Sequence, residues 1–241
     1  MTTISRLATS FARTQKAEGK SPHTIKLYGD CILRLIRWCE DDPSNLTRRN
    51  LTDFYAVRAE TVAPATVWTD WKVHRVFLQW LVDEEELTSH PMARMKAPRQ
   101  PSRPVPVLSE QDIARLLAAC SGRLRRDKRD LAIIRLALDT GARRGELAGL
   151  TVADLDLDEN VVRLTGKGKT RIVPFGSKTA MVLDRHMRAN SPTGSLFGLT
   201  PSGMSQMFKE RARAASLPAA HFHMTRHTVA HRWMAAGGSE T

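Results

Sequence analysis

Residues 130–147 read DLAIIRLALDTGARRGEL and decide the fold of the second half of the chain. Apolar residues dominate the first part of this stretch, which indicates a largely buried helix. Gly141 comes directly after it, and a glycine in this place is a common helix stop. A new helix begins at once, so Arg143 lies at its start. Free backbone N–H groups and the positive end of the helix dipole favour an anion there.

The next segment changes from helical to strand-like texture. Residues 160–175 place the β-branched runs VVRLT and RIVPF on the two sides of the glycine-rich turn GKGK, a pattern that predicts a β-hairpin. Lys167 lies at the tip of this turn, as a plain turn residue or as a proton donor to a leaving oxygen. Helices are expected on both sides, over Ile113–Cys120, which Ser109 caps, and over Lys178–Arg188 and Ser202–Ala215.

The terminal stretch His223–Ala236 has helical spacing and begins with the basic run HMTRH. Arginines from two separate segments, Arg143 and Arg226, can hold the non-bridging oxygens of one phosphodiester because guanidinium forks match phosphate oxygens. Either arginine alone is more often a structural ion-pair partner. The neighbouring basic residues are interpreted as DNA-backbone contacts or solvated charges: Arg144, Lys169 and Arg171.

A histidine cluster in the same stretch raises the question of a metal. His221, His223, His227 and His231 include i, i+4 steps that let two imidazoles share a metal on one helix face. No HExxH pattern or carboxylate partner lies nearby in the sequence. We therefore expect no metal and no cofactor.

The first part of the chain is predicted to be helical and separate. Pro91 to Pro106 carries five prolines, four basic residues and no acid, so it cannot lie inside a helix. It is interpreted as a basic linker that follows a phosphate backbone, or as a mere spacer. Before it, helices are predicted over 4–14, from Ser21-Pro22, from Asn50 and from Ala63-Pro64. Their tryptophans at helical spacing are more typical of a core than of base stacking.

Composition favours a polyanionic partner. The 241 residues carry 37 Lys and Arg against 25 Asp and Glu, a formal charge of +12. Residues 1–100 hold 15 basic and 12 acidic side chains, whereas residues 101–241 hold 22 and 13. A strongly basic chain is typical of nucleic-acid binding, although a solvated positive surface gives the same numbers.

The sequence also indicates a compartment. No apolar stretch approaches the roughly 18 residues of a membrane span, and the first residues do not resemble a signal peptide. Three cysteines without a CxxC pattern fit a reducing compartment. The prediction is a cytoplasmic protein with no membrane partner.

The three basic clusters, in this order, resemble the tyrosine recombinase (phage integrase) family. The family segment TGxRxxEL is matched from Thr140 to Leu147, and its arginine falls on Arg143. The family's GKG turn falls on Lys167, and its HxLRHT box places its histidine and second arginine on His223 and Arg226, with Thr225 replacing the commoner leucine. Residues 21–38 also resemble the family's N-terminal core-binding domain. The resemblance covers nearly the whole chain.

The resemblance implies an architecture and a chemistry. The expected fold is mainly α: a helical SAM-like core-binding domain (1–90), a basic linker (91–106) and a mostly helical catalytic domain with a small β-hairpin or sheet (107–241). The implied activity is site-specific cleavage and rejoining of double-stranded DNA through a 3′-phosphotyrosine, without metal or ATP, by protomers that form a tetramer on DNA. It assigns stabilisation of the phosphate to Arg143 and Arg226. Lys167 would protonate the leaving 5′-oxygen, and His223 would assist proton transfer.

The family's nucleophilic tyrosine has no match in this sequence. It lies some three dozen residues beyond the second arginine, whereas 15 residues follow Arg226 here, and the only tyrosines are Tyr28 and Tyr55. We therefore expect a chain that is incomplete at its C-terminal side, binds DNA and forms no phosphotyrosine by itself. The alternative is a non-catalytic DNA-binding protein that modulates a full-length recombinase. A helical polyanion binder of other ancestry would leave the four candidate side chains scattered.

Overall fold

The computed structural model describes residues 2–100, 104–166 and 168–238. The chain divides into two compact units, Met1–Arg103 and Pro104–Thr241. Each has its own cluster of buried apolar side chains, so each is described by itself.

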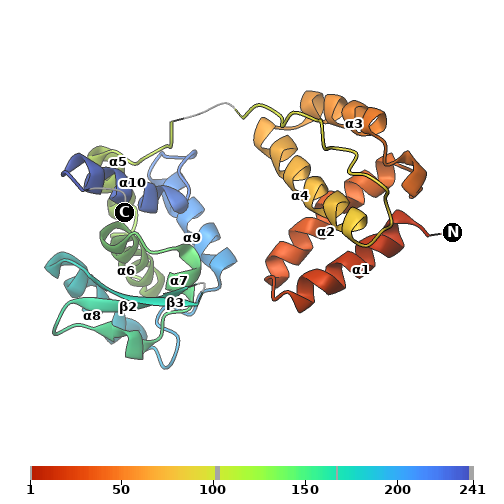
Figure 1. The fold of residues 1–241 in the computed structure, drawn as a ribbon. Helices are drawn as coiled ribbons and strands as arrows, with labels where there is room; N and C mark the ends of the chain where they lie inside the picture. The colour runs from red at the N-terminus through yellow and green to blue at the C-terminus, as the bar shows by residue number, and fades with distance from the viewer. Residues whose placement is uncertain (1, 101–103, 167, 239–241) are drawn as a thin grey trace. The chain divides into compact units, whose positions relative to one another are not determined.

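The first unit is built from helices whose ends are set by the local sequence (Figure 1). The hydroxyls of Thr3, Ser21 and Thr47 each accept a backbone N–H from the first turn of the helix that follows. A proline occupies the first position of the second and fourth helices, where its missing N–H costs nothing. The elements are α1 (Ile4–Ala17), α2 (Pro22–Trp38), η1 (Pro43–Asn45), α3 (Arg48–Thr61) and α4 (Pro64–Asp83).

A buried carboxylate joins three of these helices. Asp70 of α4 is fully buried and receives hydrogen bonds from Arg34 of α2 and from Arg58 of α3, whose Nη2 lies 2.9 Å from Oδ2. These two arginines offset the effect of burial and lower the pKa of Asp70. In the same core, the Tyr55 hydroxyl lies 2.8 Å from Nδ1 of His74, and burial lowers the pKa of His74 to about 4. Asp70 therefore stays charged while His74 stays neutral at pH 7.

The segment after α4 stays with this unit beyond Pro91. Met92 is fully buried in the first core and Met95 packs against it. The prolines that follow lie in irregular backbone up to residue 100. The apolar side chains of these two methionines therefore hold residues 92–95 against the first unit.

The second unit surrounds the buried helix α6 (Arg125–Thr140), which packs against four other helices. The sequence pattern predicted this helix from Asp130, but it begins five residues earlier, where Asp127 accepts the backbone N–H of Leu124. The other helical elements are α5 (Glu110–Ala118), α7 (Arg144–Ala148), η2 (Val152–Asp154), α8 (Ser177–Asn190), α9 (Pro201–Ala214) and α10 (His223–Ala235).

A small antiparallel sheet covers one side of this core (Figure 1). Its order is β1 (Leu155–Asp156), β2 (Val161–Gly166) and β3 (Lys169–Pro174). Leu164 pairs with Arg171, and Arg163 pairs with Ile172. Because side chains alternate across a strand, Leu164 and Arg171 face inward, whereas Arg163 and the exposed Ile172 face outward.

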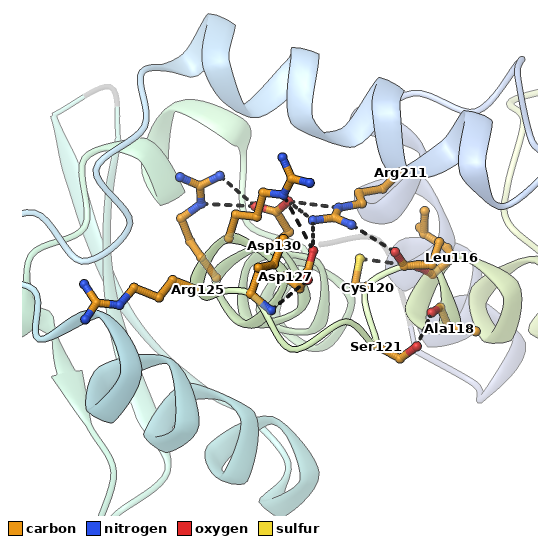
Figure 2. A network of polar contacts seen from close by, with 12 residues as sticks. Leu116, Ala118, Cys120, Ser121, Arg125, Asp127, Asp130 and Arg211 are labelled. Carbon is orange, nitrogen blue, oxygen red and sulfur yellow. Dashed lines mark hydrogen bonds and ion pairs between the residues drawn. The ribbon is translucent and has the colours of Figure 1, made fainter.

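An ion-pair network ties α9 to α6 (Figure 2). Arg211 donates to Asp127 Oδ1 and Asp130 Oδ2, each at 2.7 Å, and to the carbonyl of Ala119 at 3.0 Å. Both carboxylates are nearly inaccessible. The network therefore joins α9 to α6 and to the carbonyl of Ala119 just after α5, and it holds α9 in place.

The predicted fold class is confirmed, since the described residues form a mainly helical protein with a small sheet. The hairpin strands begin and end close to the predicted residues, and the helix after Thr47 starts two residues before the predicted Asn50. The two-residue strand β1 was not predicted. No helix among residues 2–100, 104–166 and 168–238 has the length and hydropathy to cross a membrane.

Candidate functional site

The turn between α6 and α7 places the first candidate arginine. Gly141 ends α6 in the left-handed conformation, with φ of 60°, which glycine adopts without a steric penalty. A Cβ at Gly141 would lie 3.3 Å from Cγ1 of Val229 in α10. The end of α6 therefore lies against α10, and Arg143 follows as the N-cap of α7.

A buried glutamate holds Arg143 by both its backbone and its side chain. Oε2 of Glu146 accepts the backbone N–H of Arg143 at 2.7 Å, and Oε1 accepts Nη1 of the same residue at 3.1 Å. The Glu146 side chain is 2% exposed, whereas that of Arg143 is 49% exposed. The guanidinium of Arg143 is therefore oriented by Glu146 and still open to solvent.

Arg171 of β3 donates to the same carboxylate. Its Nη1 lies 2.8 Å from Oε1 of Glu146 and its Nη2 lies 2.8 Å from Oε2. Glu146 thus accepts four hydrogen bonds, which is about the capacity of a carboxylate. The bonds from Arg171 are the main cause that lowers the pKa of Glu146 to about 2, against the opposing effect of burial.

Gly166, the last residue of β2, lies very close to the side chain of Glu146. A Cβ on Gly166 would lie 2.8 Å from Oε1 and 2.9 Å from Cγ of Glu146. Contacts under 3.0 Å are essentially never made by a real Cβ, so only glycine fits here without a shift. The residue before Lys167 is thereby fixed against the carboxylate that holds Arg143.

The second candidate arginine reaches the same turn from α10. Nη1 of Arg226 donates to the carbonyl of Gly141 at 2.6 Å. Partial burial lowers the pKa of Arg226, and the positive charges of Arg143 and Arg171 lower it further. Among the described residues, Glu146 is the one carboxylate that bonds to any of these three arginines. Three guanidinium groups therefore gather around one negative charge.

His223 opens α10 on the side of this cluster. The residue is exposed, but partial desolvation lowers the pKa of His223, and nearby charge on His227, Arg226 and Arg143 lowers it further. The His223 and His227 rings lie 4.4 Å apart in an edge-to-face arrangement. Within the described part of the chain, no three His, Cys, Asp or Glu side chains are grouped so as to hold a metal ion.

The structure brings three of the four candidate residues together. Arg143, Arg226 and His223 lie around the Gly141 turn, whereas Lys167 lies outside the described residues. The contact of Arg171 with Glu146 was not predicted from the sequence, in which Arg171 was interpreted as a DNA-backbone contact or a solvated charge. Strand alternation offered a signal, because an arginine opposite the buried Leu164 faces inward and needs a carboxylate.

The two tyrosines belong to the other unit. Tyr55 is 8% exposed and bonded to His74, and burial raises its pKa. Tyr28 is half-buried and stacks on Phe11. Both hydroxyl-bearing rings therefore serve packing in the first unit, Met1–Arg103.

This arrangement is suited to an oxyanion that offers two or more acceptor oxygens. The three arginines outnumber the one carboxylate by two positive charges. The guanidinium forks of Arg143 and Arg226 remain half-exposed or lightly bonded, and such forks match the oxygens of a phosphate. The adjoining imidazole of His223, whose pKa is lowered, adds a neutral group that can accept a proton.

Family models match both units of the chain. Residues 106–240 match the model "Phage integrase family", and residues 7–86 match "Phage integrase, N-terminal SAM-like domain". The chain is 29% identical over 232 residues to the tyrosine recombinase XerD of Ralstonia nicotianae, with 89% of this chain and 74% of that protein covered. It is 28% identical over 251 aligned positions to the tyrosine recombinase XerC of Xanthomonas campestris pv. campestris, covering 98% and 78%.

Solved structures share the fold at lower identity. A lambda integrase (75–356) dimer bound to a COC′ core site matches with a TM-score of 0.82 and 16% identity, over 98% of this chain and 91% of that one. The XerA recombinase crystal structure matches with a TM-score of 0.52 and 24% identity, over 98% and 86%. Taken with the arginine cluster and the two family models, these likenesses lead to one conclusion: the chain belongs to the phage integrase family of tyrosine recombinases.

Proposed function

We propose that this chain acts on double-stranded DNA in site-specific recombination and holds one backbone phosphate between Arg143 and Arg226. The observation that carries the proposal is the gathering of three guanidinium groups around the single carboxylate of Glu146. Guanidinium forks pointed at a phosphate stabilise the charge that develops when its ester bond is exchanged. His223 is assigned to proton transfer at this phosphate, and Lys167 to protonation of the leaving 5′-oxygen.

The division of labour between the units follows the charge. We assign DNA docking to the helical unit (about 1–90) and phosphate chemistry to the unit that begins near 107, with the basic segment 91–106 between them. Most of the formal excess charge lies in residues 101–241. The family models support this division, because they match the two parts separately.

The relatives support the same substrate class. Structures that share this fold include a lambda integrase bound to DNA and a lambda integrase tetramer bound to a Holliday junction. By analogy we propose duplex DNA as the substrate, and further protomers as partners on that DNA.

One step of the recombination reaction, the covalent attachment to DNA, is not assigned to these residues. We infer that these 241 residues by themselves form no covalent bond to DNA, because both tyrosines have structural roles in the first unit. A buried phenol with a raised pKa is a poor nucleophile. A suicide duplex, in which the cleaved fragment diffuses away, tests this on a denaturing gel. The expected result is no adduct, and an adduct would refute this inference.

The phosphate role is tested by equilibrium binding. Arg143→Met and Arg226→Met are each expected to weaken binding of a fluorescein-labelled duplex by about tenfold or more, since hydrogen bonds to charged groups contribute about 1.5–3 kcal/mol. Arg188→Met is the matched control, because Arg188 of α8 is 80% exposed and is paired with Asp184 of the same helix. Equal losses in all three variants would mean that net charge alone binds DNA.

A second candidate function is a non-catalytic DNA-binding protein that modulates a complete recombinase. The placement of both tyrosines in the first unit favours it, with Tyr55 in the core and Tyr28 packed against that core. In that case the chain occupies recombination sites and lowers the yield of a full-length enzyme, without an adduct of its own. Addition of this chain to a recombination assay, with Arg143→Met as the control, separates occupancy from inert behaviour.

A further inference from the structure

We infer that Arg171 is a positioning residue of the phosphate site: it takes up the charge of Glu146 and so leaves the guanidinium of Arg143 available to DNA. This inference rests on the proposed function, since it assigns Arg143 a phosphate. It adds a residue of the β-hairpin to the phosphate site, and this residue acts on DNA indirectly, through Glu146 and Arg143.

The geometry assigns Glu146 mainly to Arg171. Both carboxylate oxygens accept a terminal nitrogen of Arg171 at 2.8 Å, whereas Arg143 reaches one oxygen with its side chain at the longer distance of 3.1 Å. Bidentate pairing is the stronger arrangement of the two. Arg143 therefore shares a carboxylate that Arg171 already neutralises.

Burial makes this sharing necessary. The Glu146 side chain is 2% exposed, and a buried carboxylate without a partner is strongly destabilising. If Arg171 were absent, Arg143 would be the remaining side-chain partner of Glu146. The resulting pair would be neutral, so the net charge of the site would fall by one and the guanidinium of Arg143 would be held by Glu146 instead of being available to DNA.

Arg171 itself is poorly placed to bind DNA directly. Both of its terminal nitrogens donate to Glu146, and its strand position faces inward. Arg226 by contrast uses one terminal nitrogen on the carbonyl of Gly141. The Arg171 side chain is 38% exposed, but both ends of its fork are bonded to Glu146, so we infer that its effect on DNA passes through Glu146 to Arg143.

The same hairpin supplies a matched control. Arg163 lies on β2 with its side chain on the opposite face, and its Nε bonds to Oδ1 of Asp154 at 2.9 Å. It is 53% exposed, so it is an ordinary surface ion pair. Arg163→Met removes the same charge from the same element as Arg171→Met and leaves Glu146 untouched.

The experiment measures the affinity of single and double variants for a labelled mixed-sequence duplex of about 30 base pairs. The salt concentration is fixed, because an affinity for DNA depends strongly on salt. Arg171→Met is expected to weaken binding about tenfold more than Arg163→Met, close to the loss in Arg143→Met. An Arg143→Met background leaves Glu146 without an arginine partner once Arg171 is also replaced, so the fold of that double variant is checked first by circular dichroism. In the folded double variant, Arg171→Met is expected to cost no more than Arg163→Met does, because its route to DNA is already cut. Additive losses would mean a direct contact and would overturn the inference.

A suppressor separates positioning from folding. The double variant Glu146→Gln with Arg171→Met leaves no buried charge unpaired and frees Arg143, so its affinity is expected to return to within about threefold of the Arg163→Met protein. A purely structural Arg171 predicts a further loss instead. If Arg171→Met alone does not fold, as judged by circular dichroism, this double variant decides the question.

The outcomes distinguish the inference from the function on which it rests. If the unaltered protein does not bind the duplex, or if Arg143→Met binds as well as Arg188→Met, the proposed function fails. If Arg143→Met weakens binding but Arg171→Met equals Arg163→Met, the proposed function stands and the positioning role of Arg171 is wrong.

Discussion

Replacing the buried carboxylate beside Arg143 should change how the second unit responds to acid. The pKa of Glu146 is about 2 in the folded protein against 4.5 for the free group, chiefly through Arg171. As the pH falls, the unfolded chain therefore takes up this proton first. The stability that Glu146 contributes is fully present above about pH 4.5 and is lost as the pH falls toward 2. At 1.36 kcal/mol per pKa unit, the loss is about 3 kcal/mol.

The variant Glu146→Gln removes this titration, so it should lose about 3 kcal/mol less than the unaltered protein between pH 6 and pH 2.5. Urea unfolding at the two pH values, read by hydrogen exchange on peptides of α6, reports the second unit alone. Glu159→Gln, at an exposed position before β2, is the control and should behave as the unaltered protein. Equal acid losses in Glu146→Gln and the unaltered protein would refute the ion-pair account of Glu146.

Three other substitutions test the contacts of buried groups. Burial holds the pKa of His74 at about 4, so the first unit should lose about 3 kcal/mol as the pH falls from 6.5 to 4, and His74→Gln should abolish that dependence in tryptophan fluorescence. Asp70→Asn leaves two arginines without their carboxylate and should cost about 3 kcal/mol in urea unfolding; a cost under about 1 kcal/mol would contradict the buried ion pair. Gly166→Ala should lower the melting temperature and weaken duplex binding, whereas Gly145→Ala, with open space at its Cβ, should do neither.

Much of the fold could be predicted because local signals are strong. Ser21 followed by proline, Ser109 with Asp112, and Gly141 each mark a helix end by a contact within a few residues. The hairpin is similarly local, since alternation and a glycine-rich turn define it. The start of α6 was missed because its first turn, RRDKR, is polar and is held by Arg211 from a distant helix.

The candidate site could be predicted in part, for a physical reason. Motif residues at helix starts and turns made Arg143, His223 and Arg226 candidates, and the structure brings these side chains close together. The pairing of Arg171 with Glu146 spans 25 residues and depends on strand register, which the sequence does not specify. The close approach of Gly166 to Glu146 depends on the same register.

We propose that Arg143 and Arg226 hold one and the same phosphate. Ethylation interference on a duplex selected by this protein from a random pool reports that contact, because ethylation removes the charge of single phosphates. The unaltered protein should show interference at that phosphate, and Arg143→Met and Arg226→Met should each lose interference at that one position. Loss at two different phosphates, or at none, would contradict the account.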